Sequence, residues 1–121
     1  MEYSSINLKD KFGKFSDHWV PRIVSQFNNY HIKVVKVDGE FTWHEHSDTV
    51  ELFLVVAGSL DILFRDGKVN LNAGELFVVP KGVEHKPFAE KECQVLLIEP
   101  AGTVNTGNTI SDRTVHENLW I

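Results

Sequence analysis

Four side chains in the middle of the chain have the types and spacing of a metal-binding set: His44, His46, Glu51 and His85. Side chains two positions apart in an extended segment project to the same side, so His44 and His46 can face one point. Three neutral imidazoles and one carboxylate are ligands that Zn, Mn, Fe, Co and Ni accept. The residues therefore predict a site for one divalent transition metal, whose identity they leave open.

Such a ligand set allows more than one kind of chemistry. It leaves positions open on an octahedral metal, where water, dioxygen or a chelating substrate could bind. The metal could then polarise a carbonyl or enediol, or lower the pKa of bound water to about 7. A tetrahedral zinc that took all four ligands would instead be closed and structural. We find no separate Ser-His-Asp or Cys-His arrangement and no phosphate-cradling glycine loop in the sequence.

The segments that must position these residues are predicted to be short strands separated by turns. Apolar or alternating runs suggest strands at 31–37, 51–57, 60–65, 68–71, 76–79 and 93–98. Asp66-Gly67 predicts a two-residue hairpin turn. Residues 6–18 are the one helical candidate, and Asn7 could cap that helix. This pattern favours an all-β sandwich or barrel.

Glu51 can join the histidines only if the chain bends before it. On an uninterrupted strand, position 51 would face away from position 46. The turn-like residues 47–49 can reset this alternation. Glu40 and Thr42 share the parity of the histidines and are expected to point inward with them, whereas Glu45 is expected in solvent.

The four residues lie within two motifs that resemble those of the cupin superfamily. The first motif is Gly39-(four)-His44-x-His46-(four)-Glu51-(six)-Gly58, and the second is Gly74-(five)-Pro80-x-Gly82-(two)-His85-(three)-Ala89. Together they cover residues 39–89. The chain departs from the family pattern in two places: the spacer after Gly39 is one residue shorter, and Ala89 replaces the closing Asn.

The resemblance implies a fold, a ligand set and a range of functions. The fold is the cupin-type double-stranded β-helix, a jelly-roll barrel, here with a short N-terminal helix or arm and one domain over residues 1–121. By the resemblance, the four family ligands correspond to His44, His46, Glu51 and His85, whereas position 89 is not a ligand. Similar small single-domain cupins are in some cases described as resembling mannose-6-phosphate isomerase, a description that reflects sequence likeness more than demonstrated activity.

Cupins include dioxygenases, isomerases, epimerases, decarboxylases and non-catalytic binders, so the fold does not choose among them. We expect a small-molecule metalloenzyme of the isomerase or dioxygenase type. The alternative is a non-catalytic protein that uses the metal to bind a sugar or another metabolite. A cupin without metal is disfavoured by the complete ligand set.

Composition limits the partners and the compartment. The formal net charge of −5 argues against binding to nucleic acid or to an anionic membrane. The longest apolar run, residues 52–57, is far shorter than the roughly 20 residues of a membrane span. No secretion signal is visible at the start. The single Cys93 fits a reducing cytoplasm and is expected to pack in a strand.

Strands 51–57 and 95–98 are apolar on both faces, which a barrel with a solvated outer surface does not need. We therefore expect a homodimer, in which a second subunit covers the outer face. The alternative is that the N-terminal segment or Trp120 folds over it.

The remaining candidates have ordinary structural interpretations. Histidines 18, 31 and 116 are expected to be surface or core residues, and Lys81 and Glu84 to lie in a solvated loop. Six aromatic residues are expected in the core: Phe41, Trp43, Phe53, Phe64, Phe77 and Phe88. If some of them line the metal site, they would favour an apolar or ring-bearing substrate.

Overall fold

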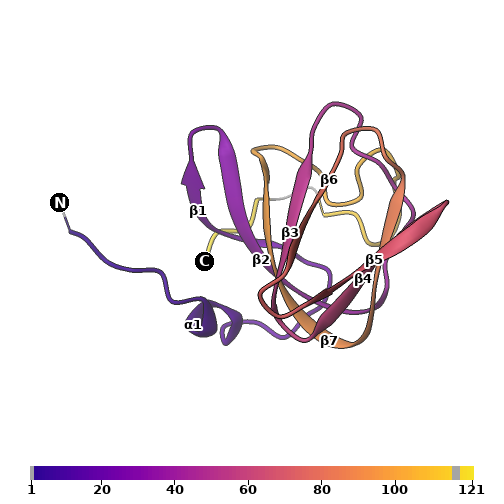
Figure 1. Ribbon diagram of the computed structural model, residues 1–121. Helices are drawn as coiled ribbons and strands as arrows, with labels where there is room; N and C mark the ends of the chain where they lie inside the picture. The colour runs from indigo at the N-terminus through magenta and orange to yellow at the C-terminus, as the bar shows by residue number, and fades with distance from the viewer. Residues whose placement is uncertain (1, 116–117) are drawn as a thin grey trace.

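Strands make up almost all of the regular structure in the computed structural model, which describes residues 2–115 and 118–121 (Figure 1). One short helix, α1 (Leu8–Phe12), precedes seven strands: β1 (Arg22–Phe27), β2 (Tyr30–Glu40), β3 (Glu51–Ala57), β4 (Ser59–Phe64), β5 (Gly67–Asn72), β6 (Leu76–Val79) and β7 (His85–Pro100). The all-β prediction is confirmed. Over the described residues, no helix combines the length and apolar character needed to cross a membrane.

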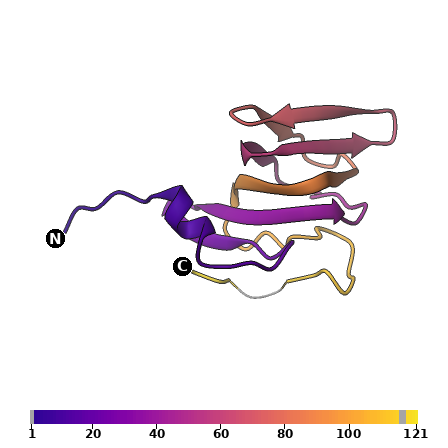
Figure 2. The same cartoon turned by 90° about the horizontal axis from the view of Figure 1, so that it is seen from below.

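The long strand β7 connects the two parts of the sheet. Its 16 residues pair with β4 near the start of the strand, with β3 toward its end, and with β2 along most of its length. The main path runs β1-β2-β7-β3-β6, and β4 carries β5 on its free side. Figure 2 shows β7, in orange, between β2 and the β4–β5 hairpin. All of these pairs are antiparallel, and the bend in β7 closes the sheet around an interior.

The core lies inside this closed sheet. Side chains alternate between the two faces of each strand, and most inward positions of the central strands are apolar. The largest buried cluster includes Val35 and Val37 of β2, Phe53 and Val55 of β3, Leu60 and Ile62 of β4, and Val95 and Leu97 of β7. Cys93 belongs to the same cluster, and burial raises the pKa of its thiol to about 11, so the prediction that it packs in a strand is confirmed.

The β4–β5 hairpin forms as expected, but its turn lies one residue earlier than predicted. Phe64 pairs with Gly67, so Arg65 and Asp66 make the two-residue connection. The register is determined by buried residues on the two strands, because Leu60 opposite Leu71 faces the interior. A shift by one residue would turn these side chains toward solvent.

The helix is shorter than the predicted 6–18 segment. The Asn7 side chain caps it by accepting a hydrogen bond of 3.0 Å from the Asp10 amide, and Gly13 ends it. Phe12 is buried against Val24 and Val34 on the outer face of the sheet, where the C-terminal Ile121 also packs. The N-terminal segment therefore covers the β1–β2 end of the outer face. The alternative to a dimer placed this cover over strands 51–57 and 95–98.

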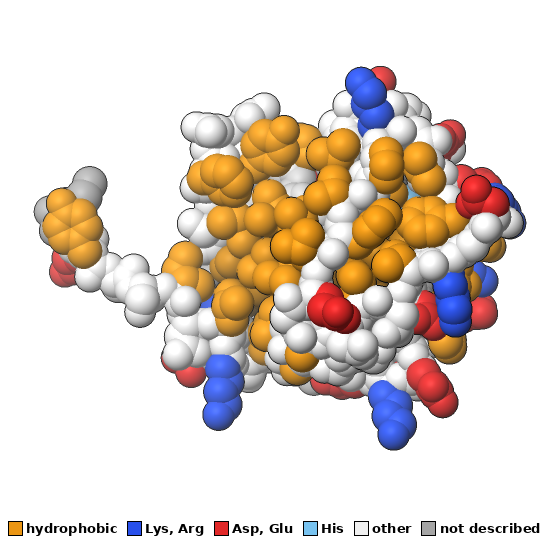
Figure 3. Space-filling view, viewed as in Figure 1, with side chains coloured by type: hydrophobic (Ala, Val, Ile, Leu, Met, Phe, Trp, Pro, Cys, Tyr) orange, Lys and Arg blue, Asp and Glu red, His pale blue; other side chains and the backbone are white. Residues whose placement is uncertain are grey.

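The rest of the outer face is less covered. Leu52 and Leu54 of β3 lie beside the cross-strand neighbours Val78 and Leu76 of β6, and on their other side beside Ile98 and Leu96 of β7. Leu76 is 56% exposed and Val78 is 42% exposed. We call these six residues the outer apolar patch. Figure 3 shows hydrophobic side chains gathered over this side of the molecule, where β1, β2, β3 and β6 lie.

Candidate metal centre

The structure brings the four sequence-predicted ligand residues together inside the barrel. One ligand atom from each of His44, His46, Glu51 and His85 can be chosen so that all lie within 4.8 Å of one another. The residues are 2%, 7%, 4% and 0% exposed, respectively. Glu51 Oε1 lies 3.4 Å from His46 Nε2 and 3.5 Å from His85 Nε2. Two ligands of one ion, each about 2.1 Å from it, lie roughly 3.0–3.4 Å apart, so the spacing suits a shared cation.

The backbone pairs the two histidine segments directly. His44 N donates to His85 O at 3.0 Å, and His85 N donates to His44 O at 2.9 Å. Segment 41–50 forms no regular strand, because this isolated bridge is its only strand-type pairing among the described residues. The side chains of His44 and His46 still share one side, since the segment is locally extended.

Two turns bring the other ligands into place. A bend at Ser47-Asp48 resets the alternation before β3, so Glu51 points inward, as predicted. The turn that ends at Gly82 delivers His85 at the start of β7, and Gly82 N donates to His46 O at 2.8 Å. Gly82 has a φ of +74°, which only glycine adopts without strain.

Backbone carbonyls orient two of the imidazoles. His44 Nδ1 lies 2.8 Å from Thr42 O, and His85 Nδ1 lies 2.9 Å from Val83 O. A carbonyl oxygen only accepts, so each Nδ1 carries the proton and each Nε2 keeps its lone pair. This is the tautomer that a metal ligand needs.

Buried polar atoms without partners indicate what the site can hold. His46 Nε2, His85 Nε2 and Glu51 Oε1 make no hydrogen bond to any described residue. Leaving such groups buried and unpaired is costly, so they call for a cation among them. The residues therefore fit the metal that the sequence predicted.

Electrostatics favour the protonation states of metal ligands. Burial, assisted by the neighbouring His85, lowers the pKa of His44 to about 4, so its imidazole is neutral at pH 7. Burial alone would raise the pKa of Glu51, but contacts with His46 and His85 lower it well below its ordinary value. Glu51 is therefore ionised.

A second carboxyl, which sequence reasoning missed, lies beside this set. Glu99 is buried on β7 and contacts Glu51, and burial together with the charge of Glu51 raises its pKa well above the ordinary value. Lys33 opposes this rise, because its Nζ donates to Glu99 Oε1 at 2.7 Å. The sequence did carry a sign of this pair: Lys33 and Glu99 are charged, yet each lies two positions from an inward-facing apolar residue of its strand.

An apolar cavity adjoins the ligand set. His44, Glu51 and Glu99 line it together with Trp19, Pro21, Val35, Val37, Phe41, Phe53, Leu60, Pro87, Val95, Leu97 and Asn105. Of the six predicted aromatic residues, Phe41 and Phe53 border it and the other four do not.

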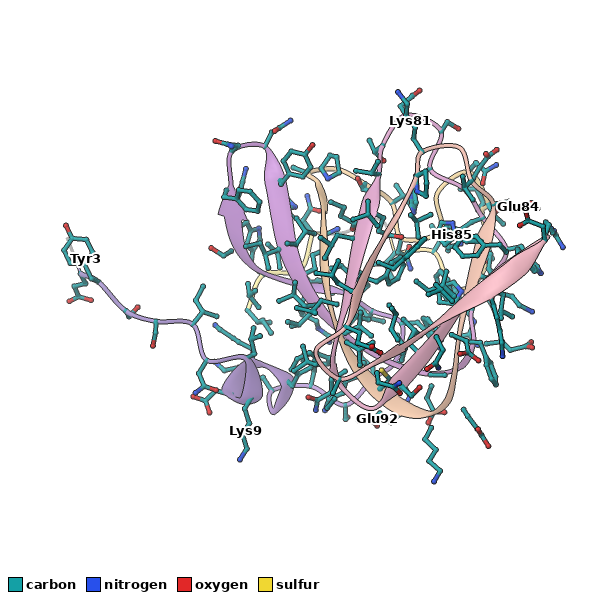
Figure 4. All side chains as sticks on the ribbon, viewed as in Figure 1. Tyr3, Lys9, Lys81, Glu84, His85 and Glu92 are labelled. Carbon is teal, nitrogen blue, oxygen red and sulfur yellow. The ribbon has the colours of Figure 1, made fainter. Side chains whose placement is uncertain are left out.

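Other residues lie apart from the site. Glu40 is exposed, and its Oε1 lies 3.5 Å from Lys86 Nζ, so its predicted inward orientation is wrong. The irregularity in the β2–β7 pairing after Val37 breaks the alternation of side chains there. Thr42 contributes its carbonyl rather than its side chain. Figure 4 shows His85 inside the barrel and Lys81 and Glu84 at its periphery.

The two other histidines that the structure describes also lie outside the cluster. His18 pairs with Glu92 at 3.0 Å on the surface, and His31 is buried beside Trp120. His116 lies outside the described residues. Glu45 is half-buried and does not belong to the ligand cluster.

A C-terminal loop holds the backbone of Glu45, the residue between His44 and His46. Asn108 accepts from Glu45 N at 3.0 Å through its side chain and donates to Glu45 O at 3.0 Å through its backbone. Gly107 allows this contact, since a Cβ there would lie 2.1 Å from Glu45 O and 3.2 Å from His44 Cδ2. The sequence offered no sign of this long-range contact.

Gly107→Ala is expected to weaken metal binding by about 10–100-fold, because the new methyl group displaces the backbone that carries His44 and His46. Gly102→Ala is the matched control: Gly102 also has a positive φ, but a Cβ there meets nothing within 4 Å. A competition titration with a chromophoric chelator measures both affinities. Equal affinities for the two variants would contradict the role of the loop.

The metal-free protein is expected to lose stability as the pH falls, through His44. Its folded pKa of about 4 lies below the unfolded value of about 6.5, so the unfolded chain binds more protons between these values. This contribution amounts to about 2 kcal/mol between pH 7 and pH 5. Urea unfolding measures how the free energy of unfolding changes with pH in the wild type and in His44→Gln, and the difference between the two slopes is the His44 contribution. The comparison is needed because the raised pKa of Glu99 makes stability change with pH in the opposite sense. Parallel slopes would refute the assignment.

Comparison with known proteins supports the fold described above. The cupin domain model matches residues 31–99, which is more than half of the chain. The crystal structure of a cupin-2 domain containing protein from Shewanella frigidimarina NCIMB 400 is 56% identical, with a TM-score of 0.78 over 78% of this chain and 93% of that one. Protein NMB1881 from Neisseria meningitidis is 32% identical, with a TM-score of 0.73 over 81% of this chain and 100% of that one.

A protein from Bacillus subtilis (strain 168), the uncharacterized protein YdbB, is 34% identical over 80 residues, and the match spans 65% of the length of each chain. The two structural relatives confirm the predicted cupin-type fold. The family model covers both histidine-bearing segments and all four clustered residues. The chain therefore belongs to the cupin family.

Proposed function

We propose that the protein holds one divalent transition metal through His44, His46, Glu51 and His85 and acts as a small-molecule metalloenzyme. The observation that carries the proposal is the group of buried, unpartnered ligand atoms facing one another beside a cavity. When bound, the metal would polarise a substrate oxygen or lower the pKa of a bound water. The chain's residues supply its binding site and exclude bulk water from it.

The cavity is the side on which a small molecule would meet the ligand set. His44 and Glu51 belong both to the cluster and to the cavity wall. Four protein ligands leave two positions of an octahedral ion for water or substrate. The set fits Zn, Mn, Fe, Co or Ni by ligand type.

Glu99 favours an enzyme over a non-catalytic binder. Its carboxyl lines the same cavity and contacts Glu51, and its Oε2 makes no hydrogen bond to a described residue. A carboxyl in this position can hold or accept a proton next to a bound substrate, as an isomerase or an oxygenase requires. A binding protein has no need for a second buried acid there, since burying it is costly.

His46→Ala and Glu51→Ala are each expected to weaken metal binding by about 100-fold or more. Losing a residue that only hydrogen-bonds to a metal ligand already costs about 10–100-fold in metal affinity, and these substitutions remove a ligand itself. Tag-free proteins are loaded with Zn²⁺ or Mn²⁺, dialysed and assayed by elemental analysis, while circular dichroism checks the fold. His18→Ala, on the surface, is the control and should retain the wild-type stoichiometry. Unchanged metal content in the first two variants would overturn the ligand assignment.

Water-proton relaxation on the Mn²⁺-loaded protein tests for an open coordination position. An enzyme of the proposed kind has exchangeable water on the metal, which raises the relaxation rate well above that of a metal enclosed by protein ligands. A low rate with full metal occupancy would favour the closed, structural site.

We also propose that a second copy of the chain covers the outer apolar patch. The patch residues Leu52, Leu54, Leu76, Val78, Leu96 and Ile98 carry no charge, and an uncharged apolar surface matches its own copy across a two-fold axis. Leu76→Lys combined with Val78→Lys should convert a dimer to a monomer in light scattering, because two ammonium groups would be buried. Ile110→Lys, at a position that is 75% exposed outside the patch, should leave the mass unchanged. A monomeric wild type at about 100 µM, the micromolar scale of a weak dimer, would refute the dimer.

A further inference from the structure

We infer that the cavity beside the metal centre selects a small, mainly apolar molecule with one oxygen-bearing end for the metal, and rejects sugars and phosphate esters. This inference rests on the proposed function and specifies its substrate class. It follows from the polar groups that the cavity wall offers and from those that it lacks.

The wall beside the ligand set is apolar. Trp19 stacks on Phe41 with ring centroids 4.7 Å apart and planes 18° apart. Phe53 stands edge-on to His85, with centroids 6.2 Å apart. Aliphatic side chains from β2, β4 and β7 complete the wall: Val35, Val37, Leu60, Val95 and Leu97. Aromatic and aliphatic surfaces of this kind suit a short hydrocarbon body.

All but one of the polar side-chain atoms of the wall are already engaged. Apart from the metal ligands, these atoms belong to Trp19, Glu99 and Asn105. Trp19 Nε1 donates to Asp38 O at 2.9 Å. The Asn105 side chain donates to Arg113 O at 2.8 Å and accepts from Val115 N at 2.8 Å. Glu99 Oε1 receives the Lys33 ammonium. Only Glu99 Oε2 remains, and it belongs to the carboxyl that contacts Glu51.

This inventory disfavours a sugar. A monosaccharide could place two neighbouring oxygens on the metal, but its other hydroxyls would enter an apolar wall without partners. Each buried and unpaired hydroxyl weakens binding by roughly 10–100-fold. A phosphate ester is disfavoured further, because among the described residues that line the cavity none is Lys or Arg, while two carboxylic residues are present.

The size of the cavity points the same way. The centre of a water-sized molecule can occupy about 40 Å³ of it, and one water needs roughly 10–15 Å³. That is room for about three waters, whereas a cavity that encloses benzene measures about 150 Å³. The occupant therefore has a body of only a few atoms, without a six-membered ring.

Isothermal titration calorimetry of the Zn²⁺-loaded, dialysed protein tests the inference with three probes of equal heavy-atom count that each offer two neighbouring oxygens: butane-1,2-diol, butane-2,3-diol and glycerol. Mannose and glycerol 3-phosphate are further probes. We expect both apolar-bodied probes to bind about 10–100-fold more tightly than glycerol, and by a larger factor than mannose or glycerol 3-phosphate, since each further unpaired hydroxyl weakens binding. Glycerol or mannose binding as tight as butane-1,2-diol binding, or no butane-1,2-diol binding to the zinc-loaded protein, would overturn the inference.

A pair of substitutions separates the cavity from general destabilisation. Val35→Thr adds a hydroxyl to the cavity wall with little change in volume and should weaken butane-1,2-diol binding about tenfold. Val34→Thr makes the same change one residue away, but Val34 packs in the outer cluster with Phe12. It should leave butane-1,2-diol binding unchanged, and both variants should keep the wild-type zinc affinity. Equal butane-1,2-diol affinity in the two variants would contradict the inference.

The two proposals fail in different ways. If the wild-type protein does not retain zinc, the proposed metal function fails. If it retains zinc but does not prefer the apolar-bodied probes, the proposed function stands and the substrate class alone is wrong.

Discussion

The backbone bridge between His44 and His85 is the interaction on which the rest of the site depends. Two hydrogen bonds join segments that are 41 positions apart in the chain and hold the two imidazole centroids 4.3 Å apart. Gly82 extends this connection to the His46 carbonyl, and Asn108 fixes Glu45 from the other side. A metal site tolerates ligand displacements of only about 0.2 Å, so a ligand set drawn from separate segments needs this kind of backbone restraint.

Such a centre costs stability. Three ligand atoms are buried without partners, and Glu51 and Glu99 bring two carboxyls into contact inside an apolar barrel. Each uncompensated polar group costs about 1–3 kcal/mol, which the surrounding core must offset. A bound cation would relieve much of this cost, so metal binding and folding are thermodynamically linked here. The Lys33–Glu99 ion pair contributes a compensating charge on the far side of Glu99 from the ligand set.

The two faces of the central strands meet different demands. The inward residues of β2, β3 and β7 pack the core and leave a dry wall beside the metal centre, where electrostatic interactions are stronger than in water. The outward residues are also apolar, but α1 and Ile121 cover only the β1–β2 end of that face. A strand that is apolar on both sides therefore serves the cavity with one face and leaves the other available for association.

The sequence by itself determined the ligand set, the β architecture and the bend before Glu51, because these depend on residue types, period-two alternation and local turn chemistry. Local signals placed the hairpin turn one residue late and made the helix too long, since buried packing of Leu60 and Phe12 decided both boundaries. The inward position of Glu99, its contact with Glu51 and the Asn108 restraint arise from pairing between distant segments. Only the tertiary structure decides which strands of alternating residues share an interior, so only the tertiary structure showed that the candidate ligand set borders an apolar cavity with a second buried acid.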